Sequence, residues 1–408
     1  MTDAQRRAGY LGLLAMASVY WFGLGTLRPV IPLYATAEFA VGVALVSWIQ
    51  SVFGLGKIIG NTPAAMAMDK FGRRRVIILG LLVVAAMDVL SAHATTFPHF
   101  LVYRGLAGIG MALVMTVALT CLLDLSTDKT RGAAVSLFLV CQVAGMAVGS
   151  AVGGWLYELG PTLAFYVRAG GSVLSIATVW PWLPARFPMA HAEATSASPH
   201  YSSLSPFAPG LWQMLIVAGG RFLAGMAILG PLWTLFLDAM KMSAPVIGLM
   251  FALINGGQLV GLLVGGRASD RVGRARILGL GLFGFAVGLV VALLSRHLGV
   301  QIAASALIGI GMGMSQAMPT AYLGDLFIGA ARARSIGYLR TAQDLGQVIG
   351  PAALGILAER KGIGTSVAVS AVLLAVLGGL ALRLPSPSRE IPIPSELPEP
   401  MAALEAAP

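Results

Sequence analysis

Residues 69–75 of this 408-residue chain read DKFGRRR, and residues 270–276, which lie 201 positions later, read DRVGRAR. The same spacing joins seven further pairs of identical residues without a gap. In order, Gly108, Gly110, Asp124, Arg131, Gln142, Gly145 and Gly149 correspond to Gly309, Gly311, Asp325, Arg332, Gln343, Gly346 and Gly350. Because charged loop residues and glycines recur together, we infer that the chain consists of two homologous halves.

The composition indicates a membrane protein. Hydrophobic residues make up 57% of the chain and charged residues only 11%, and the mean hydropathy is +0.83. A soluble protein needs more charge to cover its surface. About 20 apolar residues suffice to cross a bilayer core of about 30 Å. We expect an all-α protein with twelve transmembrane helices, near residues 9–35, 43–62, 76–95, 98–122, 133–157, 162–183, 211–237, 244–265, 276–295, 299–323, 334–357 and 364–383.

The net charge of +10 follows this topology and does not indicate a nucleic-acid partner. Of the 27 Lys and Arg residues, 17 fall on one predicted side of the membrane and 4 on the other, and the rest lie within the spans. Cytoplasmic loops carry the excess of positive charge. The distribution therefore predicts that both termini are cytoplasmic, in a multi-pass protein of the plasma (inner) membrane.

The predicted spans divide the chain into four segments. Residues 1–183 form an N-terminal six-helix bundle and residues 211–384 a C-terminal one. Between them, residues 184–210 are rich in Ser, Ala and Pro, which is typical of a flexible cytoplasmic linker. Residues 385–408 are rich in Pro and Glu, and we expect a disordered cytoplasmic tail.

Known signatures of enzymes and cofactor sites are missing from the sequence. There is no phosphate-binding Gly-Lys-Ser loop, so ATP is not the expected energy source. There is no helical His-Glu-x-x-His, and the five histidines are scattered. We expect a protein that is not an enzyme and uses no cofactor or metal.

The doubled loop motif resembles the signature of the major facilitator superfamily. That signature reads Gly-x-x-x-Asp-Arg/Lys-x-Gly-Arg-Arg/Lys, and residues 65–74 depart from it only in Ala65, whereas residues 266–274 keep the leading Gly. Arg104, Gly108 and Gly110 are similar to the family's motif in helix four. The resemblance implies two pseudo-symmetric bundles of six helices. It also implies that helices one, four, seven and ten line a central cavity, flanked by helices two, five, eight and eleven.

Helix five favours one branch of this family. Residues 145–154 read GMAVGSAVGG and resemble the Gly-x-x-x-Gly-Pro-x-x-Gly-Gly motif of the 12-helix drug–proton antiporters, with Ser150 where Pro is expected. In the other half, Gly350 is followed by Pro351. The same glycines would also serve close helix packing, since Gly at positions i and i+4 flattens one helix face. The pattern favours an efflux antiporter and leaves the direction of transport open.

The repeated loops predict a gate on the cytoplasmic side. Glycine would allow the tight turn between two antiparallel helices, and the arginine after it would reach a carboxylate at a helix end. Asp69 can lie at the positive end of a neighbouring helix. The alternative is that the arginines serve topology alone. The predicted gating residues are Asp69, Gly72, Arg73, Asp124 and Arg131 in the first half and Asp270, Gly273, Arg274, Asp325 and Arg332 in the second.

Ionisable residues inside a membrane are costly unless they are paired or wet, so they indicate function. Together with two amides on helix eight, they give the predicted pathway for substrate or protons: Arg28, Lys57, Arg104, Arg221, Asn255, Gln258, Arg340 and Asp344. Asp88 and Arg168 are left out because helices three and six are expected to pack outside. An Arg340–Asp344 pair at i, i+4 is the alternative to a transport role for both residues.

Two of these residues carry the sharper hypotheses. Arg221 lies near mid-membrane without an acidic residue one turn away, and a guanidinium there would suit a carboxylate or phosphate. Arg28 on helix one would add to such an anion site. Asp344 is expected to bind the coupling proton, because partial burial favours its neutral form and Arg340 favours its charged form.

These features predict a secondary active transporter that works by alternating access. The leading interpretation is proton-coupled export of a small organic or amphiphilic solute by a monomer in the lipid bilayer. One alternative is uptake or exchange of an organic anion. Another is a receptor or scaffold that binds a ligand without moving it, although such a protein would have no need of doubled gates.

Overall fold

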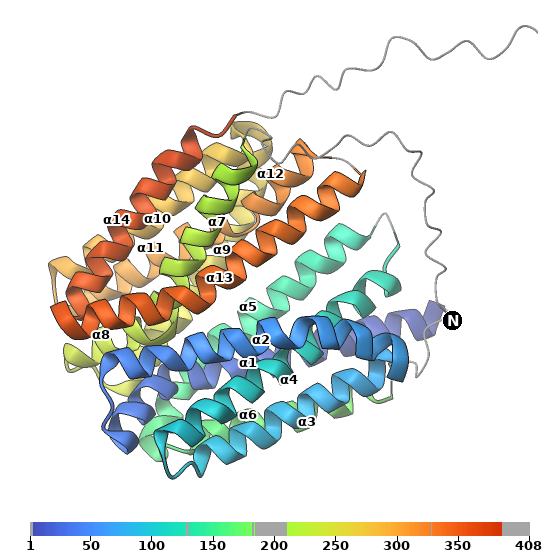
Figure 1. Ribbon diagram of the computed structural model, residues 1–408, viewed down its shortest axis with the longest axis horizontal. Helices are drawn as coiled ribbons and strands as arrows, with labels where there is room; N and C mark the ends of the chain where they lie inside the picture. The colour runs from blue at the N-terminus through green and yellow to red at the C-terminus, as the bar shows by residue number, and fades with distance from the viewer. Residues whose placement is uncertain (1–2, 128–129, 182, 184–209, 328, 386–408) are drawn as a thin grey trace, which may run out of the picture.

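The computed structural model describes residues 3–127, 130–181, 183, 210–327 and 329–385. Within these residues the regular structure is helical (Figure 1). The elements are α1 (Asp3–Phe39), α2 (Val43–Phe71), α3 (Arg73–Ala92), α4 (Phe97–Leu125), α5 (Arg131–Leu159), α6 (Leu163–Val179), α7 (Leu211–Ala227), η1 (Ile228–Leu232), α8 (Trp233–Ala239), α9 (Ala244–Val272), α10 (Arg274–Leu294), α11 (Leu298–Gln316), α12 (Met318–Leu326), α13 (Gly329–Lys361) and α14 (Ile363–Leu382). The predicted linker and tail lie outside the described residues, apart from Gly210 and Pro385.

These elements form twelve passes, because α7, η1 and α8 continue one another and so do α11 and α12. Ten passes are long and apolar enough to cross a membrane. The other two are α6, with 17 residues, and α13, which carries charged residues along its length. The prediction of an all-α membrane protein with twelve helices is therefore confirmed.

Proline accounts for both interruptions. Pro231 lies within η1, where Gly230 leaves the helical region with ψ of −108°. Pro319 lies in the first turn of α12, directly after α11 has ended. Proline has no N–H to donate, and its ring clashes with the preceding turn, so a helix breaks or restarts there. Both passes were expected to be continuous helices, at residues 211–237 and 299–323.

The 201-residue repeat is visible in the packing of the glycines. A Cβ atom on Gly149 would collide with the backbone oxygen of Phe22, and one on Gly350 would collide with that of Leu223. Phe22 and Leu223 are themselves 201 positions apart. The α1–α5 contact thus recurs between α7 and α13, because only glycine allows this backbone approach.

The two halves meet along two helix pairs, α5 with α9 and α2 with α13. We call the end of the bundle that holds the Gly72 and Gly273 turns the motif face. The contacts lie away from it: Gly355 packs on Ser47, and the Ala44 N–H donates to Glu359 Oε2 at 2.6 Å. From these contacts α2 and α13 diverge toward the motif face, the end of the molecule marked N (Figure 1). The halves are therefore closed at the face opposite the motifs.

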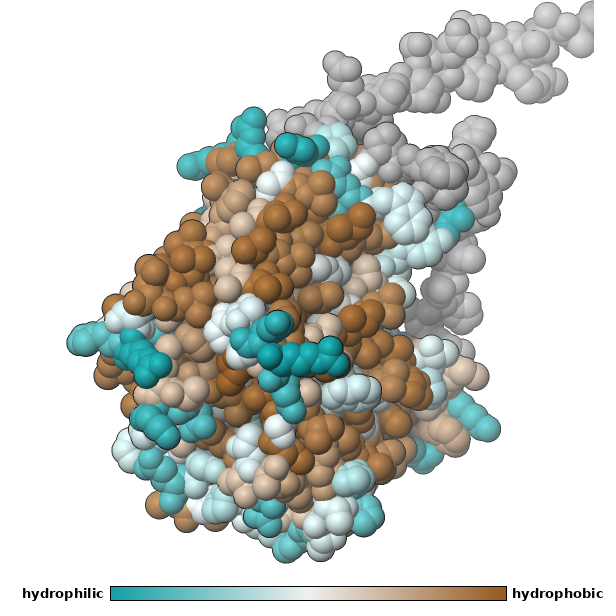
Figure 2. Space-filling model, turned by 60° about the vertical axis from the view of Figure 1, so that its left-hand side comes forward, coloured by the Kyte–Doolittle hydropathy of each residue, from teal (hydrophilic) through white to brown (hydrophobic). Residues whose placement is uncertain are grey.

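The outer surface is apolar. Figure 2 shows broad brown areas over the helices, with teal residues in separate groups. Large hydrophobic side chains are exposed on many helices; examples are Leu82, Val148, Val264, Ile349 and Val372. A water-soluble monomer rarely exposes so much contiguous apolar surface. Such a surface is suited to contact with the lipid of a membrane.

Candidate functional site

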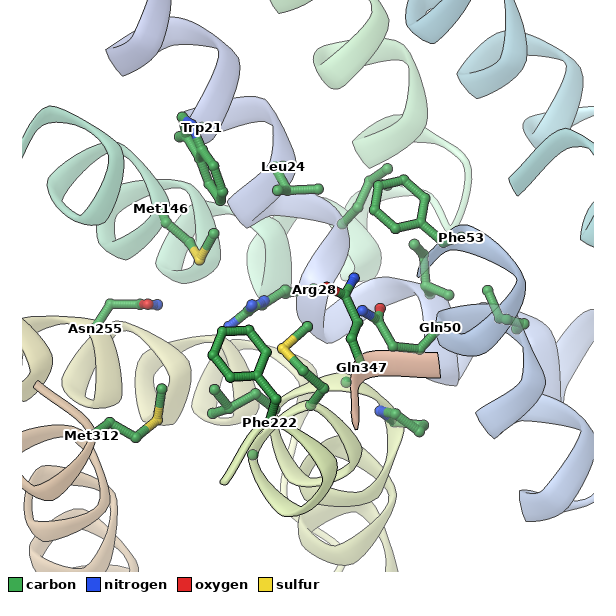
Figure 3. Close-up of a pocket in the computed structure, with 18 of the residues that line it drawn as sticks. Trp21, Leu24, Arg28, Gln50, Phe53, Met146, Phe222, Asn255, Met312 and Gln347 are labelled. Carbon is green, nitrogen blue, oxygen red and sulfur yellow. The ribbon is translucent and has the colours of Figure 1, made fainter. Parts of the chain in front are cut away.

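A cavity of about 300 Å³ lies between the two halves. Side chains from α1, α2, α4 and α5 of the first half and from α7, η1, α9, α11 and α13 of the second point into one space (Figure 3). Its walls are largely apolar, with aromatic and methionine side chains that include Trp21, Phe53, Met146, Phe222 and Met312. Amide side chains add neutral polar groups: Gln50, Gln142, Asn255, Gln258, Gln316 and Gln347.

The charged groups of the cavity are all cationic. Among the described residues that line it, four are basic and none is Asp or Glu. The four are Arg28, Lys57, Arg104 and Arg221. Six of the eight pathway residues predicted from the sequence thus share one cavity, with Asn255 and Gln258 as the other two. The remaining two, Arg340 and Asp344, lie outside its lining.

Arg28 is the cavity cation without a polar partner in the described part of the chain. It extends from α1 into the middle of the cavity, among side chains of both halves (Figure 3). No hydrogen bond or ion pair joins it to another residue in the described part of the chain. A guanidinium in this position is compensated only by water or by an anion in the cavity.

Arg221 is held by neutral groups. Its Nε donates to Ser315 Oγ at 2.9 Å, and its Nη2 donates to the backbone oxygen of Met312 at 3.1 Å. Arg221 thus has fixed neutral partners, whereas Arg28 has no polar partner among the described residues. No carboxylate neutralises Arg221 in the described residues, so its positive charge still acts on the cavity.

Lys57 is paired across the two halves. Its Nζ lies 2.9 Å from Asp344 Oδ1 and 3.3 Å from Gln347 Oε1, so α2 is tied to α13. Both side chains keep some exposure, 27% for Lys57 and 20% for Asp344. The Arg340–Asp344 pair, which was the alternative to a transport role, is not formed; Arg340 is exposed on α13, and Asp344 pairs with Lys57 instead.

Arg104 belongs to a buried network within the first half. Asp88 on α3 receives a hydrogen bond from Arg104, and Arg168 Nε on α6 donates to the same carboxylate at 2.8 Å. All three side chains are almost fully buried. Arg168 also reaches the hydroxyl of Tyr20 at 3.4 Å. One carboxylate thus holds two guanidinium groups, and one of these, Arg104, lines the cavity.

Asp88 and Arg168, which were left out of the sequence-based site, do not line the cavity, but Asp88 binds Arg104, which does. Helices three and six do lie behind the cavity, but these two side chains point inward. Nothing in the spacing of Asp88 and Arg104 reveals the contact. The available signal was that α3, α4 and α6 each carry a charged residue in their interior, because buried charges are usually paired.

The amides on α9 bond to their own half. Asn255 Nδ2 donates to the backbone oxygen of Phe251 at 2.8 Å, and Gln258 Nε2 donates to Gln316 Oε1 at 2.6 Å. Gln258 thereby holds the end of α11 close to the break before α12. Both amides present polar surface to the cavity without adding charge.

The loop motifs have the predicted local geometry. Gly72 and Gly273 have φ of 86° and 100°, in the region that favours glycine. Arg73 forms an ion pair with Asp124. In the second half, Arg274 reaches Asp325 at 3.3 Å and Asp270 at 3.1 Å.

Three other gating residues lie at the same face. Asp69 is exposed at the end of α2, Arg131 is exposed at the start of α5, and Arg332 is exposed in the first turn of α13. The Arg73–Asp124 and Arg274–Asp325 pairs each stay within one half, as expected where the halves have separated.

The described residues contain no group of three or more His, Cys, Asp or Glu side chains that could hold a metal ion. The site offers positive charge, amides and apolar walls. This chemistry suits reversible binding of an amphiphilic molecule.

Comparison with known proteins agrees with the geometry. The sequence model of the Major Facilitator Superfamily matches residues 13–224 and 215–406. A bacterial homologue of the human lysosomal transporter Spinster, in an inward-facing and unoccupied conformation, superimposes with a TM-score of 0.77 over 94% of this chain and 97% of its own, at 16% identity.

Among curated proteins, Multidrug resistance protein 1 of Bacillus subtilis is 28% identical over 254 residues, 62% of this chain and 63% of its own length. The multidrug efflux pump LfrA of Mycolicibacterium smegmatis is 25% identical over 80% of this chain and 76% of its own. The 3-(3-hydroxy-phenyl)propionate transporter of Escherichia coli is 29% identical over 41% of each chain. The matched region spans less than two thirds of the first of these relatives.

Proposed function

The chain belongs to the Major Facilitator Superfamily, and we propose that this secondary transporter carries small amphiphilic organic anions through its central cavity by alternating access. The observation that carries the proposal is the unpartnered guanidinium of Arg28 in a cavity whose described lining has no carboxylate. Family membership agrees with the expectation that the protein is not an enzyme.

Electrostatics favours an anion over a cation. Two unit charges about 4 Å apart interact by roughly 4 kcal/mol at an effective dielectric constant of 20. Lys57 and Arg104 have carboxylate partners, but Arg28 and Arg221 have none among the described residues, so the cavity has a surplus of positive charge. A cationic drug entering it would meet repulsion and find no counter-charge.

The apolar walls define the rest of the substrate. Trp21, Phe53 and Phe222 are not needed for charge recognition, and such side chains suit a ring or short hydrocarbon chain. A cavity of about 300 Å³ is at the lower end of small-molecule sites. An aromatic carboxylate or sulfonate combines the required size, charge and hydrophobicity.

The positive-inside distribution supports a cytoplasmic motif face, and therefore cytoplasmic termini and an inward-facing conformation here. We propose that Asp69, Asp270 and the arginines of the two loop motifs close this face when the cavity opens to the other side. The plasma (inner) membrane as location, protons as coupling ions and a monomeric state belong to the same proposal.

A second candidate is proton-driven export of uncharged or cationic drugs. The names of two relatives, a multidrug resistance protein and a multidrug efflux pump, favour it. It shares the fold and the gates with the first candidate. The two differ in the charge of the substrate.

Three matched probes separate the candidates: 3-phenylpropionate, its neutral amide, and the cation 3-phenylpropylammonium. Binding is measured by calorimetry on the purified full chain in nanodiscs. We expect the carboxylate to bind most tightly and Arg28→Leu to weaken it by about 1.5–3 kcal/mol, the range for a hydrogen bond to a charged group. The exposed Arg334→Gln serves as control and should change nothing. If the ammonium binds best, the anion proposal is wrong and drug export stands.

A further inference from the structure

The Lys57–Asp344 pair lies between the cavity and the second half. Lys57 lines the cavity, while Asp344 lies behind it on α13 and binds the same ammonium group at 2.9 Å. Gln347, which does line the cavity, accepts a second hydrogen bond from Lys57 at 3.3 Å. An anion in the cavity could therefore approach Lys57 from the side opposite Asp344.

The pair exists in only one copy of the repeat. Lys57 corresponds to Gln258, and Asp344 corresponds to Val143, 201 positions earlier. The α9–α11 glycine contact forms with Gln258 at the position of Lys57, and the α1–α5 glycine contact forms with Val143 at the position of Asp344. The fold therefore does not require the pair, and a function within the cavity explains it better.

The surroundings of the pair are otherwise positive. Arg28 of α1, Arg104 of α4 and Arg221 of α7 face the same cavity. On α13 itself, Arg340 lies one turn before Asp344 and is exposed. Among the other elements that contact α13, η1 and α14 contain no charged residue, and the carboxylate that α12 contributes, Asp325, pairs with Arg274 at the motif face.

We propose that the anionic group of the substrate takes the place of Asp344 on Lys57, and that the released Asp344 binds a proton. This inference rests on the proposed function. The Lys57–Asp344 contact is replaced by a contact between Lys57 and the substrate, Lys57 stays protonated, and the proton comes from water on the open side. Asp344 is then neutral, which avoids the cost of a partly buried carboxylate without a partner.

Charge balance makes the coupling productive. The empty site contains one ammonium and one carboxylate, and the loaded site contains one ammonium, one anion and one neutral acid. Both states have the same net charge, so both can cross between the two conformations at similar electrostatic cost. Proton and anion travel together, which makes the transporter a symporter and directs net flux along the proton gradient.

Binding linkage gives the expected sign. If one proton binds with each anion, the affinity falls as pH rises, by up to about tenfold per pH unit, because linkage is reciprocal. A carboxylate probe remains ionised above about pH 6, since its own pKa is about 4. Any pH dependence of binding above about pH 6 therefore comes from the protein and not from the probe.

The test measures the affinity for 3-phenylpropionate between pH 6 and 8 in the full chain in nanodiscs, compared with its amide. We expect the parent and Arg334→Gln to lose carboxylate affinity as pH rises. Asp344→Asn should bind the carboxylate with little pH dependence, and Lys57→Gln should lose carboxylate affinity while keeping that for the amide. Carboxylate binding without pH dependence in the parent would overturn the linkage and leave the proposed function standing.

A second measurement does not depend on any ligand. Infrared spectroscopy detects the C=O stretch of a protonated carboxylic acid, and subtraction of Lys57→Met/Asp344→Asn from Lys57→Met isolates Asp344. We expect the band to appear at a higher pH in Lys57→Met than in the parent, because the variant lacks the ammonium group that Asp344 contacts at 2.9 Å. If the band appears at the same pH in both, Lys57 does not influence it and the inference fails, whatever the substrate proves to be.

Discussion

The two halves share their glycine contacts but not their buried charges. Gly108 packs on the backbone oxygen of Phe53 as Gly309 packs on that of Ile254. By contrast, Asp88 and Arg104 of the first half correspond to Leu289 and Ser305 of the second. The repeated residues build the helix contacts and the turns, and the unrepeated ones distinguish what each half does in the cavity.

The second half differs in a further way. Its passes α7–η1–α8 and α11–α12 are interrupted, whereas α1 and α4 of the first half are continuous. Gly230, Pro231 and Gln316, at or next to the breaks, line the cavity. The first half therefore offers a wall held by buried ion pairs, and the second offers a wall whose helices can bend. Discontinuous helices commonly form substrate sites in transporters.

The largest effect is expected from Asp88→Ala. Removing this carboxylate leaves two buried guanidinium groups without their counter-charge, which typically costs about 3–5 kcal/mol. We expect a large fall in the apparent unfolding temperature of the purified protein. The triple variant Asp88→Leu, Arg104→Met and Arg168→Met removes all three charges and should recover most of the loss. A triple variant as unstable as Asp88→Ala would show that the network matters for something other than charge compensation.

Equivalent glycines should respond equally in the two halves. A Cβ at Gly149 or Gly350 would meet backbone atoms that cannot move aside, so each Ala variant should lose roughly 1–3 kcal/mol of stability, as expected of overpacking. Gly337→Ala, in open space on α13, is the control. The measurement is the unfolding temperature of each variant. A clear difference between Gly149→Ala and Gly350→Ala would break the structural equivalence of the halves.

A smaller effect is expected at Arg221. Its hydrogen bonds to Ser315 and Met312 already satisfy part of the guanidinium. Arg221→Ala should weaken 3-phenylpropionate binding by about 1 kcal/mol through lost charge, in the range of an ordinary hydrogen bond. Arg221→Lys should restore part of the affinity, because the charge returns without the planar fork. Calorimetry on both variants decides this, and a loss as large as that of Arg28→Leu would make Arg221 a direct ligand.

The smallest change in the folded protein is expected from Asp69→Asn and Asp270→Asn. Both side chains are exposed at the motif face, so folding and membrane insertion should be preserved. Initial transport rates in proteoliposomes should fall, because the closed state of this face loses a contact. If both variants transport at the parental rate, the motif specifies only the turn and the membrane topology.

The sequence predicted the passes, the repeat and the turns because each is local or periodic. The positive φ of Gly72 and the Arg73–Asp124 pair follow from the motif and its position in the repeat. The breaks at Pro231 and Pro319 could have been predicted, because proline interrupts a helix. The partners of Asp344 and Arg104 could not be predicted, because they depend on how α2 faces α13 and how α3 and α6 rotate. The i, i+4 spacing offered Arg340 as a partner for Asp344. In the folded chain Asp344 pairs with Lys57 of the other half instead.

The central claim is that the cavity selects a negative charge. Its most direct test is flux of radiolabelled 3-phenylpropionate and 3-phenylpropylammonium into proteoliposomes that contain the parent or Arg28→Leu. We predict that the parent transports the carboxylate and not the ammonium, and that Arg28→Leu loses most of the carboxylate flux. Transport of the ammonium by the parent, with carboxylate flux no higher than in protein-free vesicles, would contradict the account.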